Sequence, residues 1–243
     1  MNPYNNIEAK KVQIGKMFDS IAPYYDRLNN LLSFSMHRYW RKQFLKSVMR
    51  QVPHTLLDIA TGTGDVAISL ALKMKNSQIV GIDISNEMLE VAQEKVASKG
   101  LQNKIKLIYG DAESLPFDNS SFDAVTIVFG IRNFQNIPLA LEEIYKTLKA
   151  NGELYIMEFS KPRNKVFCII YKFYFLKILP IIGSLISKDD KAYKYLPQSV
   201  YEFHNNIEIL DMMKNTGFKG CQAKSLSNGI AYIYSGIKKF ENK

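Results

Sequence analysis

Apolar residues follow two different periods along the chain. Residues 5–50 carry them at helical spacing, which predicts an N-terminal group of helices. Two stripes show this spacing: Leu28, Leu31 and Leu32, then Trp40, Phe44, Leu45 and Val48. From Thr55 the pattern changes to short apolar runs, each of a length that suits a buried parallel strand. We expect five such strands, at residues 55–60, 79–84, 105–109, 122–129 and 153–159.

Helical patterns fill the gaps between these runs. They cover residues 65–75, 86–99 and 138–148. Ser85 is placed to cap the second of these helices, and Gly100 follows its end. Strands that alternate with helices predict an α/β protein with a doubly wound, mostly parallel sheet and helices on both faces.

Two regions follow the fifth strand. Residues 161–205 predict a helical insertion that covers the active site, because the apolar run 166–187 contains lysines and a proline and is a poor membrane span. Residues 218–224 and 229–238 predict a final antiparallel pair of strands, joined through Ser227-Asn228-Gly229. We therefore expect a single domain over residues 1–243 with a seven-stranded sheet. Its parts are N-terminal helices that form a lid (1–50), a core (55–160), the insertion (161–205) and a C-terminal helix and strand pair (206–243).

Composition narrows the class of protein. A content of 47% hydrophobic and 23% charged residues is that of a globular protein and excludes a disordered one. The net charge of +9 favours contact with phosphates or anionic lipid headgroups, although a solvated basic surface is an equal alternative. Two cysteines cannot form a disulfide framework, and the N-terminus lacks the pattern of a secretory signal. We expect a cytoplasmic protein.

The glycine-rich segment Asp58-Ile59-Ala60-Thr61-Gly62-Thr63-Gly64-Asp65 lies between the first strand and the first core helix. Its glycines let the backbone turn sharply and approach a ligand closely. Gly62-x-Gly64-x-x-Ala67 also satisfies the dinucleotide fingerprint, and Asp83 lies about 20 residues further on, as a ribose-binding acid should. The motif alone therefore leaves three interpretations open: a nicotinamide cofactor, S-adenosylmethionine, or a plain strand–helix turn with packing glycines.

Three features favour S-adenosylmethionine. Asp58 lies inside the end of the strand, where it would repel a pyrophosphate but could face the amino and sulfonium charges. Gly110-Asp111-Ala112 follows the third strand, where it could contact adenine, and a strand pair closes the chain. In these features the chain resembles the class I methyltransferases, with Ala60 in place of the first glycine of their motif. That resemblance implies a Rossmann-like fold and cofactor contacts from Asp58, Gly62, Thr63, Gly64, Asp83, Asp111 and Ala112.

Two further segments closely resemble the menaquinone and ubiquinone biosynthesis C-methyltransferases. Residues 25–40 carry a Tyr-Asp-x-x-Asn…Ser-x-x-x-His-x-x-Trp signature, and residues 129–133 read Phe-Gly-Ile-Arg-Asn. Residues 158–162, 193–200 and 229–231 also resemble that family, so the resemblance spans nearly the whole chain. The departures are Leu28 for methionine, Ala150-Asn151-Gly152 for a Pro-Gly-Gly turn, and Tyr234 for histidine.

The resemblance implies methylation of a ring carbon of a prenylated quinol. Carbon is a weak nucleophile unless the adjacent hydroxyl is deprotonated, so the site needs a base or a group that stabilises the oxyanion. Arg132 suits the oxyanion, Asn133 could orient the same oxygen, and His37 has a pKa range that suits a base. Tyr25 and Phe129 are expected to contact the substrate. The alternatives are a salt bridge within the fold for Arg132, a structural helix contact for His37 and lid packing for Tyr25.

Partners and competing functions follow from the same residues. We expect a lipophilic prenylated quinol as the substrate, no nucleic acid and no metal, since the three histidines are far apart in sequence. Peripheral membrane contact through residues 166–187 at the inner face of the membrane stays open, as does a homodimer. Demethylmenaquinol is the expected substrate, with the ubiquinone precursor as the alternative. Another small-molecule methyltransferase, a nucleic-acid methyltransferase, a nicotinamide-dependent oxidoreductase and a non-catalytic adenosine-binding protein are the competing interpretations.

Overall fold

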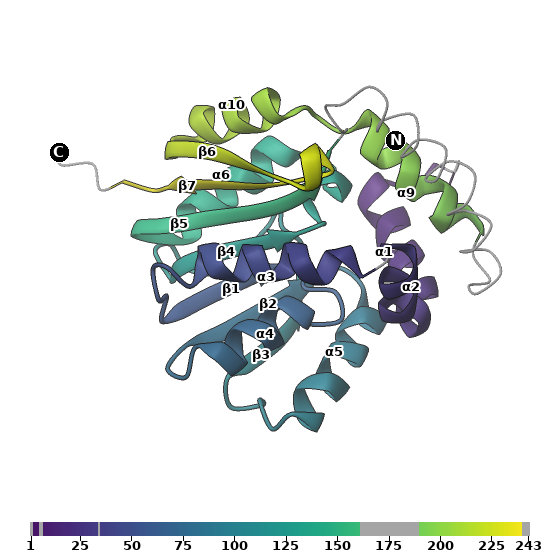
Figure 1. The fold of residues 1–243 in the computed structure, drawn as a ribbon, viewed down its shortest axis with the longest axis horizontal. Helices are drawn as coiled ribbons and strands as arrows, with labels where there is room; N and C mark the ends of the chain where they lie inside the picture. The colour runs from purple at the N-terminus through teal and green to yellow at the C-terminus, as the bar shows by residue number, and fades with distance from the viewer. Residues whose placement is uncertain (1, 5–6, 34, 161–189, 240–243) are drawn as a thin grey trace.

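The computed structural model describes residues 2–4, 7–33, 35–160 and 190–239, and its centre is a seven-stranded sheet (Figure 1). The strand order is β3-β2-β1-β4-β5-β7-β6. The first five strands are parallel, and β7 runs antiparallel to β5 and β6. The strands are β1 (Thr55–Ile59), β2 (Gln78–Asp83), β3 (Ile105–Tyr109), β4 (Phe122–Val128), β5 (Leu148–Phe159), β6 (Lys219–Leu226) and β7 (Ala231–Ile237). The predicted fold is confirmed.

Helices cover both faces of this sheet. They are α1 (Lys10–Ile21), α2 (Tyr25–Leu32), α3 (Met36–Val48), α4 (Asp65–Lys73), α5 (Asn86–Ser98), α6 (Ile137–Thr147), α9 (Asp190–Glu202) and α10 (Asn206–Thr216). One apolar core contains Phe44 of α3 and Leu70 of α4, and the core on the other face contains Ile144 of α6 and Met213 of α10. In Figure 1, α3 crosses in front of the sheet. Two buried apolar layers around one sheet are the arrangement that the strand–helix alternation predicts.

The predicted caps and the predicted hairpin are present. The Ser85 hydroxyl accepts a hydrogen bond from the Met88 amide at 3.2 Å and so caps α5. Gly100, after the end of α5, has a φ of +64°, a left-handed conformation that glycine adopts without strain. A 3-10 turn at Ser227–Gly229 joins β6 to β7, as the sequence indicated.

A third apolar cluster holds the N-terminal helices over the end of the sheet. It joins Met17 of α1 and Leu28 of α2 to Met88 of α5 and Tyr195 of α9. Leu28, which replaces a methionine of the resembled family, is 2% exposed and therefore has a packing role. Figure 1 shows α1, α2 and α9 gathered at one end of the sheet, so that they form a cover over that end.

Some boundaries differ from the sequence prediction. The first helix begins at Lys10 rather than near residue 5. Strand β5 begins at Leu148, which pairs with Phe122, and the register shifts before Glu153 because Asn151 adopts a φ of +63°. The apolar run 166–187 lies outside the described residues. Among the residues that the structure does describe, no helix is long and apolar enough to cross a membrane.

The loops after β1 and β4 approach each other very closely. Ala60 and Phe129 have φ values of +54° and +56°, a region that is unfavourable for residues with a side chain. A Cβ atom on Gly130 would lie only 2.6 Å from the Cβ atom of Ala60. The methyl group of Ala60, where the class I motif has glycine, therefore makes glycine necessary at position 130.

We predict that Gly130→Ala destabilises the fold by about 1–3 kcal/mol, because the new methyl group overlaps Ala60. Ala60→Gly in the same chain should restore most of this loss, since it removes the opposing methyl group. Ala60→Gly alone should change stability little, because relief of the left-handed strain is offset by greater entropy of the unfolded chain. Urea unfolding of the three variants measures the coupling. A double variant as unstable as Gly130→Ala would contradict this interpretation.

Candidate active site

Two adjacent cavities lie at the carboxyl ends of the parallel strands, where ligands bind in open α/β sheets. The first is enclosed by α1–α3, the loop after β1 and the loop after β4. The second lies between the ends of β2, β3 and β4 and α1. Tyr25, Gly62 and Phe129 line both cavities, so the two spaces share a wall.

The cavities collect the residues that the sequence singled out. The first is lined by Tyr25, His37, Asp58, Gly62, Thr63, Phe129 and Arg132. The second is lined by Tyr25, Gly62, Asp83, Asp111, Ala112, Phe129 and Asn133. Gly64 lines neither cavity, and the need for glycine at this position comes from helix packing instead. It has a φ of +78°, and a Cβ atom there would lie 3.2 Å from Ala92 Cβ, so Gly64 permits close packing of α4 on α5.

Gly62 leaves an open approach to the backbone between the two cavities. Its φ is +55°, and nothing lies within 4 Å of the position that a Cβ atom would occupy. Its amide donates a hydrogen bond of 2.8 Å to Oδ2 of Asp83, while Oδ1 of Asp83 accepts from the Ser85 amide at 3.0 Å. Asp83 therefore holds the glycine loop and the start of α5 together.

Two buried carboxyl groups have raised pKa values. Burial raises the pKa of Asp83 to about 6, against hydrogen bonds from backbone amides that favour its ionised form. Burial also raises the pKa of Asp58 to about 6, although the hydroxyl groups of Thr61 and Thr126 donate to it at 2.7 and 2.6 Å. A cationic group or further hydroxyl donors in these cavities would stabilise both carboxylates. The donor set therefore fits a ligand with ribose hydroxyls and a positive charge.

Two lysines of α1 that the sequence interpretation did not identify hold this helix against the loops around the second cavity, and one of them, Lys11, lines the cavity. Lys11 Nζ forms an ion pair with Asp111 Oδ2 at 2.9 Å. Lys10 Nζ donates to the carbonyl oxygens of Arg132 at 3.1 Å and Phe134 at 2.8 Å, and burial lowers its pKa. These contacts join α1 to the loops after β3 and β4.

A polar network joins α2 and α3 to the glycine-rich loop between β1 and α4 and to α5. Lys95 Nζ of α5 donates to Asp26 Oδ2 of α2 at 2.8 Å and to Asp65 Oδ1 of α4 at 2.5 Å. Arg41 of α3 forms an ion pair with Asp65, and the Thr63 hydroxyl donates to Asp26 Oδ1 at 2.7 Å. The side chain of Thr63 thus contacts the lid, which leaves its backbone as the group that could contact a ligand.

Arg132 is buried, lines the first cavity and forms the salt bridge that the sequence left as its alternative role. Its Nη1 donates to Glu158 Oε1 at 2.8 Å and to the carbonyl oxygen of Phe129 at 2.5 Å. The side chains of Arg132 and Glu158 are 7% and 0% exposed. Burial raises the pKa of Glu158, and the guanidinium opposes that shift. Within the described residues, Nη2 of Arg132 has no hydrogen-bond partner, so part of the guanidinium can serve a ligand.

The side chain of Asn133 does not point in the same direction as that of Arg132. Residues 131–133 form a 3-10 turn, in which successive side chains diverge by about 120°. The side chain of Asn133 therefore lines the second cavity, and its Oδ1 accepts from the Tyr195 hydroxyl of α9 at 3.1 Å. The structure does not place Asn133 beside Arg132 in the first cavity, where the sequence interpretation expected both to address one oxygen.

The hydrogen bonds of His37 define one tautomer. Ser33 Oγ lies 2.6 Å from the carbonyl oxygen of Asn29 and 2.6 Å from Nδ1 of His37. Because a carbonyl oxygen only accepts, we assign the hydroxyl proton to that contact and a proton on Nδ1 to the other. Nε2 of His37 is then the unprotonated ring nitrogen. Burial and the nearby Arg41 and Arg38 lower the pKa of His37 and so favour the neutral ring.

Aromatic rings form the apolar wall of the first cavity. Phe129 stacks on Phe159 with a centroid distance of 4.2 Å, and Trp40 packs edge-on against both rings at 6.2 and 5.8 Å. Tyr25 packs edge-on against Phe18, and burial raises its pKa. Tyr234, where the resembled family often has histidine, lines neither cavity, since its hydroxyl donates to Asn206 Oδ1 at 2.6 Å. This wall suits a flat, uncharged ring.

We predict that Glu158→Gln destabilises the protein by about 3–5 kcal/mol, because it leaves the buried guanidinium of Arg132 without its counter-charge. Arg132→Met combined with Glu158→Gln should cost less than the sum of the two single variants, since no unpaired charge remains. Chemical unfolding of all three variants provides the comparison. Strictly additive losses would show that the ion pair contributes no coupling.

Comparisons with known proteins agree over almost the whole chain. The model of the ubiE/COQ5 methyltransferase family matches residues 6–238. A demethylmenaquinone methyltransferase of Porphyromonas gingivalis is 41% identical over 239 residues, which cover 98% of both chains. A ubiquinone/menaquinone biosynthesis C-methyltransferase UbiE of Geotalea uraniireducens is 46% identical over 233 residues, 96% of this chain and 99% of that one. The crystal structure of a SAM-dependent methyltransferase from Aquifex aeolicus has a TM-score of 0.59 at 18% identity, over 80% of this chain and 89% of that one, and supports the fold alone.

Proposed function

The chain belongs to the ubiE/COQ5 methyltransferase family, and from this premise we propose that it transfers a methyl group to a ring carbon of a prenylated quinol, with demethylmenaquinol as the substrate. One observation carries the proposal. The cavity that contains the buried carboxyl group of Asp58 is also lined by the guanidinium of Arg132 and by a stacked aromatic wall. It therefore offers a negative group for a cationic donor and a positive group for an anionic ring oxygen.

The cofactor is S-adenosyl-L-methionine, which supplies an electrophilic methyl group on a sulfonium when bound. We assign Asp83 to the ribose hydroxyls, because its carboxylate gains stability from added donors. Asp111 and Ala112 would contact the adenine. Asp58 and the backbone of Gly62–Thr63 would contact the charged amino-acid end of the cofactor. Raised pKa values at both buried carboxyl groups support this assignment.

His37 and Arg132 would make the ring carbon nucleophilic. Nε2 of His37, left unprotonated by the contact with Ser33, accepts the proton of the ring hydroxyl. The guanidinium of Arg132 stabilises the resulting oxyanion, while Glu158 beneath it keeps the side chain in place. The proton on the methylated carbon would then pass to water, and the electron pair of the broken C–H bond would restore the aromatic ring. Protonated His37 would return its proton to the ring oxygen, which resets the base. Phe129 and Tyr25 would position the ring between these groups.

The proposal also covers which quinol is methylated and where in the cell the protein works. The relatives' names include both demethylmenaquinone and ubiquinone/menaquinone biosynthesis, so methylation of the ubiquinone precursor is the second candidate function. Because a prenylated quinol is lipophilic, we propose that the protein works in the cytoplasm with peripheral contact to the membrane. A homodimer stays a prediction.

We predict that purified protein transfers labelled methyl groups to reduced demethylmenaquinol. His37→Gln should lower kcat by roughly 100- to 10,000-fold, because it removes the base. Arg132→Lys should also lower kcat, since an ammonium lacks the planar fork that contacts Glu158 and the oxyanion together. Tyr39→Phe, an exposed neighbour on α3, is the matched control and should retain activity. Transfer to a tRNA and to neither quinol would overturn the proposed function.

We predict that the affinity for S-adenosylmethionine rises with pH up to about 6 and then levels off. In the ligand-free protein, Asp58 and Asp83 are protonated below that value, and the cation and hydroxyls of the ligand favour their ionised forms. Each carboxyl should cost roughly tenfold in affinity per pH unit below about 6. Asp58→Asn should reduce the slope to that of Asp83 alone. Isothermal titration calorimetry measures both slopes, and a flat profile for the wild type would contradict the assignment.

A further inference from the structure

The outer side of α3 is a basic stripe. Between Asp26 and Asp58 the chain contains six lysines and arginines and no acidic residue. Arg38, Lys42 and Lys46 of α3 and Arg50 just after it are spaced four residues apart, so they lie along one side of the helix, and all four are exposed. In the described part of the chain, Lys42, Lys46 and Arg50 make no ion pair, whereas Arg41 on the inner side pairs with Asp65. The charge of the stripe is thus uncompensated.

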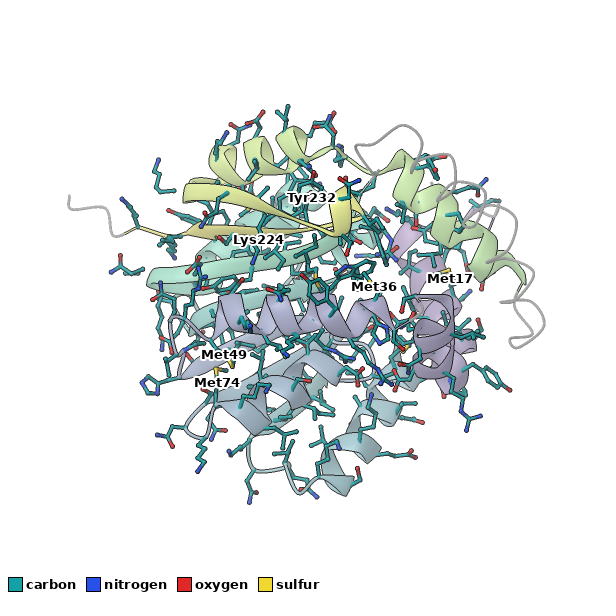
Figure 2. All side chains as sticks on the ribbon, viewed as in Figure 1. Met17, Met36, Met49, Met74, Lys224 and Tyr232 are labelled. Carbon is teal, nitrogen blue, oxygen red and sulfur yellow. The ribbon has the colours of Figure 1, made fainter. Side chains whose placement is uncertain are left out.

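Exposed apolar side chains adjoin the beginning of this stripe. Leu31 near the end of α2 and Met36 and Tyr39 at the start of α3 are 49%, 39% and 50% exposed. Figure 2 labels Met36 at the start of α3, and the helix can be followed from there across the front of the sheet. We call Leu31, Met36 and Tyr39 the apolar corner. It combines with the basic stripe into one surface that has both apolar and cationic groups.

The same two helices form a wall of the first cavity from their inner side. Leu28 and Asn29 of α2 and His37, Trp40 and Arg41 of α3 line that cavity. The surface outside and the cavity inside are therefore separated by the thickness of one helix layer. A partner bound to the outer surface would lie next to the entrance elements of the site.

We propose that the basic stripe and the apolar corner dock on an anionic lipid surface. The charge of the stripe complements anionic headgroups, and the apolar corner inserts at the level where headgroups meet acyl chains. This inference rests on the proposed function for its purpose, because a lipophilic quinol resides in such a surface and α2–α3 would lie between the lipid and the cavity. It assigns the contact to α3 rather than to residues 166–187.

Lipid is favoured over nucleic acid by the apolar corner. Contacts with a nucleic-acid backbone are made by cationic and polar groups, and base stacking requires planar side chains. Tyr39 is the one planar side chain of the apolar corner, whereas Leu31 and Met36 supply neither kind of contact. All three match the apolar component of an interfacial membrane helix.

The test is sedimentation with vesicles at low and high salt, using phosphatidylcholine alone and phosphatidylcholine with about a third of phosphatidylglycerol. Wild-type protein should sediment with the anionic vesicles only, and less at high salt because the charges are screened. Lys42→Gln/Lys46→Gln/Arg50→Gln should lower vesicle partitioning on the order of 100-fold. Met36→Ser/Tyr39→Ser should weaken binding at both salt concentrations, because it removes the apolar part.

The matched control is Lys99→Gln/Lys106→Gln/Lys219→Gln, which removes the same charge from exposed sites at other places on the fold. It should bind vesicles as the wild type does. Equal binding by the two triple variants, or binding of the wild type to RNA but not to vesicles, would overturn the proposal. Circular dichroism verifies that each variant is folded.

Activity measurements separate this inference from the proposed function. The stripe variant should methylate a water-soluble short-chain quinol at the wild-type rate and lose activity on quinol embedded in anionic vesicles. If the wild type methylates neither substrate, the proposed function fails while the sedimentation result still decides the lipid contact. If the stripe variant uses both substrates like the wild type, the lipid contact has no role in substrate delivery.

Discussion

The site depends on a buried positive charge with a negative charge directly beneath it. A guanidinium that is only 7% exposed would be very unfavourable without a counter-charge, and Glu158 at the end of β5 provides one. The same carboxylate accepts from the backbone amide of Arg132, and the guanidinium donates to the carbonyl oxygen of Phe129. The ion pair thereby holds the first part of the loop after β4, from the left-handed residue Phe129 to Arg132, next to the aromatic stack. Lys10 holds the following part through the carbonyl oxygens of Arg132 and Phe134.

The cover over the cavities is held by a different kind of interaction. Its apolar cluster is small, and Lys95, Asp26, Asp65 and Arg41 join it to the glycine loop through partly exposed ion pairs. Such pairs contribute little stability individually, because water competes for each charge. The sheet is stabilised by two large apolar cores, whereas the cover of α1, α2 and α9 is held in place partly by weak polar contacts. Opening of the cover would therefore break these ion pairs and leave the strands of the sheet intact.

Much of this arrangement could be predicted from the sequence, and the exceptions have physical reasons. The strand ends, the cap at Ser85 and the glycine loop follow from local patterns, and eleven of the twelve predicted site residues line a cavity. The partners of Lys95, Lys11 and Arg132 come from elements far apart in sequence, so no local pattern reveals them. The direction of Asn133 depends on a 3-10 turn rather than on residue type, and β5 begins early because of a left-handed Asn151 that propensity does not indicate.

Under the proposed mechanism, the contact between Ser33 and His37 makes proton abstraction depend on the conformation of the α2–α3 turn. Both residues lie where α2 turns into α3, and the carbonyl that receives the serine proton belongs to the last turn of α2. Nε2 of His37 is unprotonated because the helical backbone of this turn places the carbonyl oxygen of Asn29 beside the Ser33 hydroxyl. In the proposed mechanism, unwinding of this turn would let the two ring nitrogens exchange the proton, so that His37 presents an unprotonated Nε2 to the ring hydroxyl in only part of the molecules.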